Sequence, residues 1–65
     1  MGLTDREKEI LVHLSKGMTN AQISNALFIS EGTTKKHISN ILSKLNLNNR
    51  VEAVLYTRKI FGSEI

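Results

Sequence analysis

The sequence predicts an all-α fold made of four helices. Apolar residues recur at the three- and four-residue spacing of helices, no segment alternates as a strand would, and proline is absent from the 65 residues. A chain of this length forms one domain, so we treat residues 1–65 as a single domain. The helices are expected at about residues 5–16, 20–27, 31–45 and 50–60.

The first two helices each begin with the signal of a capping box, in which a threonine and the residue three positions later cap each other's backbone amides. The two pairs are Thr4 with Glu7 and Thr19 with Gln22. Gly17 ends the first helix, because glycine suits the left-handed residue that follows the last turn of many helices.

The second and third helices are separated by a short apolar turn. Phe28 and Ile29 are too apolar for an exposed loop, so we expect both to fill the core. Ser30 then caps the third helix. The apolar face of that helix comprises Ile38, Ile41, Leu42 and Leu45. Asparagine tolerates left-handed backbone, so the helix ends either at Asn46 or at the pair Asn48-Asn49.

The fourth helix begins with Asn49 and Glu52, again at capping spacing, and carries apolar residues on two faces. A surface helix needs only one apolar face to cover a core. The second face therefore indicates either a partner or wide packing into a small core. It comprises Ala53, Tyr56 and Ile60, with Thr57 beside them.

The positive charge of the chain lies in one segment. Residues 31–50 hold four basic residues and one acidic residue, which accounts for the whole formal net charge of +3, while the remaining segments balance to zero. A localised basic surface is typical of phosphate-binding proteins. The simpler alternative is a solvated helix face with ordinary lysines.

The composition excludes several classes of function. There is no cysteine, and two separate histidines cannot form a closed metal site without converging carboxylates. No apolar run approaches the roughly 20 residues of a membrane span. The chain is too short to line a walled cleft, and no catalytic constellation is present. We expect a cytoplasmic, non-enzymatic binding module without metal, cofactor, small-molecule ligand or membrane contact.

A two-turn helix, a short turn and a longer helix have the outline of a helix-turn-helix motif, whose second helix enters the major groove of DNA. The outer face of the third helix fits this role, since beyond its first turn it carries basic and small polar residues and no acid. Lysine, serine and asparagine can all read base edges or hold phosphates. Gly32 has no side chain, so the backbone of the third helix can approach the groove. Helix N-termini bind anions, which favours phosphate contacts at Thr19, Asn20 and Ser30.

These motifs resemble the LuxR/FixJ-type, or GerE-like, helix-turn-helix domains. The resemblance covers about residues 3–57 without a gap. It rests on LTDREKEIL from residue 3, TNAQIS from residue 19, LFIS from residue 27, TTKKHISNI from residue 33 and NRVEAV from residue 49.

The resemblance implies a tetrahelical DNA-binding fold in a bacterial transcriptional regulator. Such a domain is usually the C-terminal effector of a two-component response regulator, and in some members a stand-alone transcription factor. The expected base contacts are Lys35, Lys36, Ser39 and Asn40. The expected phosphate contacts are Thr19, Asn20, Ser30, Thr33, Lys44 and Arg50. A homodimer is expected through Ala53, Tyr56, Thr57 and Ile60. Double-stranded DNA is the main partner, and RNA polymerase is a further candidate.

Three residues depart from the family pattern. Thr34 stands where valine is usual, Ser24 where alanine is common, and Asn46 where glycine is common. The last exchange is acceptable if Asn46 is left-handed. A helical protein-interaction module, using the third or fourth helix as a docking surface, is the alternative from a different functional class.

Overall fold

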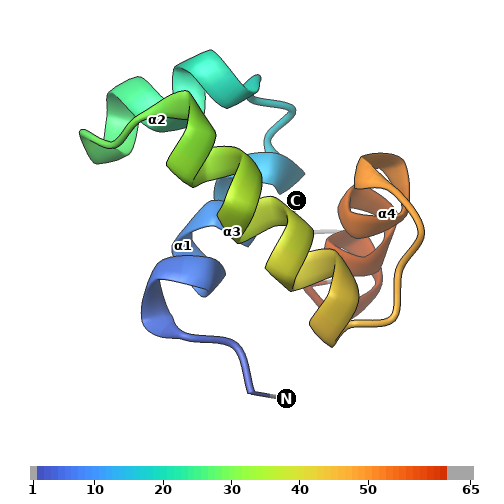
Figure 1. The fold of residues 1–65 in the computed structure, drawn as a ribbon. Coiled ribbons are helices and arrows are strands. Elements are labelled where there is room, and N and C mark those ends of the chain that lie inside the picture. Colours follow the sequence, from blue (N-terminus) through green and yellow to red (C-terminus); the bar gives the residue numbers. More distant parts are fainter. Residues whose placement is uncertain (1, 62–65) are drawn as a thin grey trace.

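The computed structural model describes residues 2–61, and these residues form four helices and no strand (Figure 1). The helices are α1 (Asp5–Ser15), α2 (Asn20–Leu27), α3 (Glu31–Lys44) and α4 (Arg50–Phe61). The predicted all-α class is confirmed, and each predicted boundary lies within one residue of the observed one. Both ends of the expected domain, at residues 1 and 62–65, lie outside the described residues.

The capping boxes of α1 and α2 are present as predicted. The Thr4 hydroxyl accepts from the Glu7 amide at 3.1 Å, while the Glu7 carboxylate accepts from the Thr4 amide at 2.9 Å. The same reciprocal pair joins Thr19 and Gln22, at 3.1 and 2.8 Å. Each box satisfies two amides that a helix N-terminus otherwise leaves without a helical partner.

Left-handed residues end α1 and α3. Gly17 follows α1 with a φ of 78°, and Asn46 follows α3 with a φ of 56°. The amide of Asn46 donates to the Ser43 carbonyl at 3.2 Å, and that of Leu47 to the Leu42 carbonyl at 2.8 Å. This pair of bonds is the Schellman arrangement, which satisfies carbonyls at a helix end. Asn46 therefore replaces glycine without loss of the cap.

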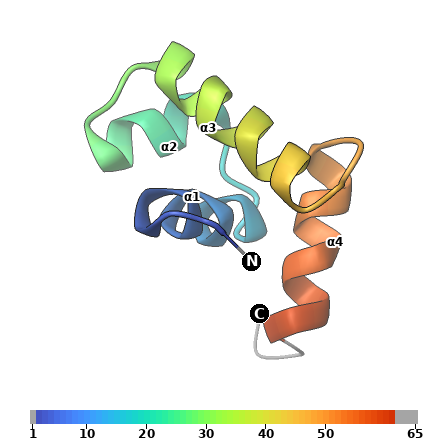
Figure 2. The same ribbon diagram turned by 60° about the horizontal axis from the view of Figure 1, so that its bottom comes forward.

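The helices pack so that one side of α3 stays uncovered. α3 lies across α1 and α2, and α4 packs against α1 near the C-terminal end of α3 (Figures 1 and 2). The core is formed by Ile10, Leu11, Leu14, Ile23, Ile38, Ile41 and Ala53. Because every helix contributes to this core, the outer face of α3 is supported from beneath by the other three.

Two expectations about burial are wrong. Phe28 does not fill the core: its side chain is 94% exposed, and only Ile29 packs against the core residues. Ala53 and Thr57 do not face a partner, because both are 0% exposed inside the folded chain. Of the four residues assigned to a dimer, these two cover the core, whereas Tyr56 is half-buried and Ile60 is 45% exposed.

Candidate nucleic-acid interface

The outer face of α3 presents the four residues that were predicted to contact bases. They are Lys35, Lys36, Ser39 and Asn40, and all four are exposed. Ile38 and Ile41, on the opposite side of the same helix, are buried in the core. The burial of one face therefore fixes the rotation of α3 and directs the polar donors outward.

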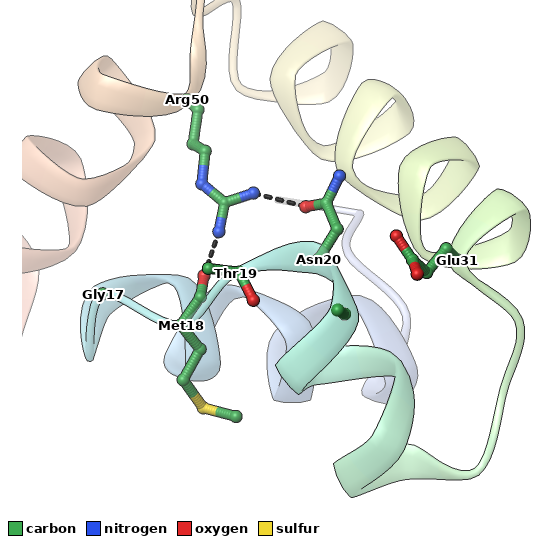
Figure 3. A pocket seen from close by; sticks show the side chains of 7 residues that line it. Gly17, Met18, Thr19, Asn20, Glu31 and Arg50 are labelled. Carbon is green, nitrogen blue, oxygen red and sulfur yellow. Dashed lines mark hydrogen bonds between the residues drawn. The ribbon is translucent and has the colours of Figure 1, made fainter.

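A shallow hollow of about 490 Å³ lies beside α3, at the N-terminal end of α2. It is lined by Gly17, Met18, Thr19, Asn20, Ala21, Glu31 and Arg50 (Figure 3). Three of the predicted phosphate contacts, Thr19, Asn20 and Arg50, meet here. The hollow thus combines a helix N-terminus with a guanidinium, both of which attract anions.

Arg50 holds the start of α4 against the start of α2. Its Nη1 donates to the Asn20 side-chain oxygen and its Nη2 donates to the Met18 carbonyl (Figure 3). These bonds use two of the five guanidinium N–H donors, so the charge is positioned while other donors remain for a ligand. The Asn20 amide nitrogen also keeps its donor capacity.

A second hollow of about 290 Å³ continues the first along α3. Its lining residues are Asn20, Lys35, Ile38, Ser39, Leu42 and Arg50. Asn20 and Arg50 line both hollows, so one concave strip runs from the start of α2 onto α3. The strip brings the predicted base contacts Lys35 and Ser39 beside the predicted phosphate contacts.

Ser30 and Thr33 line neither hollow and form a separate polar group at the start of α3. The Ser30 hydroxyl accepts from the Thr33 amide at 3.0 Å and donates to the Thr33 hydroxyl at 2.9 Å. Both residues are exposed. Ser30 therefore caps the helix, while Thr33 keeps a hydroxyl hydrogen that it can donate outward.

Lys44 is exposed, but its ammonium makes two contacts within the chain. Its ammonium lies 2.7 Å from the Glu7 carboxylate and 3.1 Å from the Gly2 carbonyl. Glu7 is only 3% exposed, and its hydrogen bonds from Lys44 and from the Thr4 amide lower the pKa of its carboxyl below the ordinary value. The Glu7 carboxylate offsets the charge of Lys44 and two of the three ammonium hydrogens are engaged, so Lys44 has less capacity for the predicted phosphate contact.

Two features of this surface were missed by sequence reasoning. Glu31 lines the first hollow, so an acid lies among the donors there. The Glu7–Lys44 pair joins residues 37 positions apart. The capping spacing of Glu7 predicts only its local bond to Thr4, and nothing in the sequence pattern indicates the distant one.

Among residues 2–61, no group of three histidine, aspartate or glutamate side chains is placed to hold a metal ion. Within the same residues, none of the helices has the length and apolar character needed to cross a bilayer.

The short helix α2, the turn and the exposed helix α3 define a helix-turn-helix domain. The chain belongs to the LuxR family of bacterial regulatory proteins, because its residues 1–57 match the sequence model of that family. The fold agrees with the crystal structure of the response regulator ChrA of a heme-sensing two-component system. That match has a TM-score of 0.83 and 44% identity, and it covers 91% of this chain and 29% of ChrA.

Similar curated proteins are bacterial transcriptional regulators. The transcriptional regulatory protein LnrK of Bacillus subtilis (strain 168) is 46% identical over 57 residues, which are 88% of this chain and 26% of LnrK. The response regulator VraR of Staphylococcus aureus (strain Mu3) is 50% identical over 54 residues, which are 83% of this chain and 26% of VraR. The chain thus spans about a quarter of the length of these relatives.

Proposed function

We propose that this domain binds duplex DNA sequence-specifically, with α3 in the major groove, as the effector domain of a bacterial two-component response regulator. The observation that carries the proposal is the concave strip. It places the exposed donors of α3 beside the start of α2 and the positioned guanidinium of Arg50. Base edges and phosphates lie side by side in a major groove, and this strip offers donors to both.

Individual roles follow from position. The proposed base contacts are Lys35, Lys36, Ser39 and Asn40, and the proposed phosphate contacts are Thr19, Asn20, Ser30, Thr33 and Arg50. Lys44 is left out of the phosphate set because Glu7 already offsets its charge. Its proposed role is to brace the C-terminal end of α3.

The functional unit that we propose is a dimer on two half-sites about 10 base pairs apart. The exposed face of α4, which carries Val51 and Leu55, replaces the core-facing residues as the surface for the second copy. RNA polymerase is a further proposed partner, with no residues assigned to it. Binding to a bacterial chromosome would place the protein in the cytoplasm.

The decisive experiment selects bound duplexes from random-sequence DNA and then compares variants on the selected duplex. Replacing Lys35 and Lys36 with alanine should weaken binding about 100-fold or more, since each base contact contributes about 1–3 kcal/mol. The helical circular dichroism signal should persist, because both side chains are exposed.

The matched control replaces Lys8 and Lys16 with alanine. Both lysines are exposed and lie on or just after α1, so this variant removes the same charge from another surface. It should retain most of its affinity. Equal losses in the two variants would show a general charge effect, and unchanged binding of the α3 variant would favour the protein-interaction alternative.

A further inference from the structure

Phe28 has a backbone conformation and an exposure that folding does not favour. It follows α2 with a φ of 58°, in the left-handed region, and its side chain is 94% exposed. A bulky residue is disfavoured there by its Cβ, whereas glycine or asparagine is tolerated. The aromatic ring therefore stabilises neither the turn nor the core.

Gly32 is the converse case, four residues further along. It lies in the first turn of α3 and has no positive φ. A Cβ added there would meet only the Ser30 hydroxyl at 3.9 Å, which is an ordinary contact. Alanine would fit this position and favour the helix, so neither conformation nor packing requires a glycine.

An aromatic residue thus stands where folding favours glycine, and a glycine stands where folding favours a side chain. The cap of α3 needs neither side chain, because the Ser30 hydroxyl accepts from the Thr33 amide. Strained backbone and exposed apolar surface often occur at binding sites. We propose that Phe28 and Gly32 form an additional DNA contact at the start of α3. Phe28 packs on apolar groups at the edge of the groove, and Gly32 lets the helix backbone approach.

The partner is duplex DNA rather than another protein, an inference that rests on the proposed function. The exposed residues nearest in sequence to Phe28 are small or polar, namely Asn25, Ala26, Ser30 and the acidic Glu31. A single aromatic in polar surroundings is too small for a protein interface core. It suits a duplex edge, where deoxyribose rings and thymine methyl groups lie between phosphates. Lys36 lies one turn beyond Gly32, so the contact continues the proposed base-reading face.

The test uses variants that should bind DNA less well and yet be more stable. Phe28→Asn, Phe28→Gly and Gly32→Ala should each raise the thermal unfolding temperature, because each removes a conformational disadvantage. Each should also weaken binding to the duplex selected by the wild-type chain. For Phe28 the loss should be roughly tenfold, the value for one partly buried apolar contact.

Fluorescence anisotropy and thermal unfolding by circular dichroism give the two readouts. Val12→Ala is the matched control, since it trims an exposed apolar side chain on α1 and should leave affinity unchanged. A duplex in which deoxyuridine replaces thymidine separates the two sources of contact. The effect of Phe28→Asn should vanish on it if Phe28 touches a thymine methyl group, and persist if Phe28 touches the sugar.

Wild-type affinity in both Phe28 variants would contradict the proposed contact. In that case, loss of binding in the Lys35/Lys36 variant would show that the proposed function still stands. A wild-type chain that selects no duplex would instead overturn the proposed function itself.

Discussion

Ser24 and Thr34 show how two residue-scale departures from a family pattern compensate each other. Their hydroxyl oxygens lie 2.8 Å apart in the buried contact between α2 and α3. Ser24 also reaches the Asn20 carbonyl at 2.7 Å, and Thr34 reaches the Ser30 carbonyl at 3.2 Å. Two hydroxyl hydrogens are available for these three contacts, so one hydroxyl donates to the other, which donates to its carbonyl, and each side chain has a partner despite its burial.

The pair predicts a non-additive mutational cycle. Ser24→Ala or Thr34→Val alone should lower the free energy of unfolding by about 1 kcal/mol, because either change removes the buried hydrogen bond between the two hydroxyls. The double variant should lie closer to wild type than the sum of the single effects. Urea denaturation measures all four proteins, with the exposed Ser43→Ala as a control. Additive effects would contradict the proposed compensation.

At the scale of the element, α4 shows that helix packing buries only one of two apolar faces. Both faces of this helix carry apolar residues, and the face with Ala53 and Thr57 covers the core. Val51 and Leu55, one turn apart on the other side, are 66% and 55% exposed. Exposed apolar residues at this spacing form a stripe that a second α4 could cover.

The α4 stripe predicts which variants separate dimerisation from base reading. Val51→Thr combined with Leu55→Gln should leave binding to a single half-site unchanged, since neither residue lies on α3. Binding to a duplex with two half-sites should fall about tenfold or more, through lost cooperativity. Gel-shift titrations on both duplexes give the comparison, with Val12→Thr as the control. An unchanged affinity for the duplex with two half-sites would contradict a dimer interface on α4.

At the scale of the whole molecule, the Lys44 ammonium joins the C-terminal end of α3 to the N-terminal segment of the chain. Lys44 ends α3, Glu7 belongs to the capping box of α1, and Gly2 lies before the first helix. The pair therefore ties the beginning of the described chain to the C-terminal end of the helix that carries the proposed base contacts. Because Glu7 is buried, removing Lys44 would leave its carboxylate without this partner.

This pair predicts a loss of stability in acid. The folded-state pKa of Glu7 lies below its ordinary value of 4.5, so the unfolded chain takes up the proton first as the pH falls. The stabilisation is therefore complete above the ordinary value and is lost as the pH falls through the folded-state value. Glu7→Gln, which can still form the capping box, should be less stable than wild type near neutral pH, and the difference should shrink in acid.

Free energies of unfolding from about pH 6 to about pH 3 test this expectation. Glu9→Gln is the matched control on the same helix, because Glu9 is exposed and lies 3.8 Å from Arg6. Its pH profile should follow that of the wild type. A constant gap between wild type and Glu7→Gln throughout the range would contradict the assignment.

Sequence reasoning succeeded where the relevant interactions are local. The capping boxes at Thr4 and Thr19 were predictable because their hydrogen bonds span three residues. The rotation of α3 was predictable because its apolar residues lie on a single face. Predictions were wrong where burial depends on distant elements. Phe28 is apolar but lies at a turn that no helix covers, and the two faces of α4 could not be ranked without knowing where α1 packs.

By itself, the sequence determined the four helices, their caps and the polar outer face of α3, since each depends on contacts within a few residues. Only the tertiary structure decided that Arg50 meets Asn20, that Glu7 offsets the charge of Lys44, and that α4 turns Val51 and Leu55 outward. The physical reason is chain connectivity. Helix formation is encoded over three or four neighbouring residues, whereas these pairings join segments that become neighbours only after the helices have packed around one core.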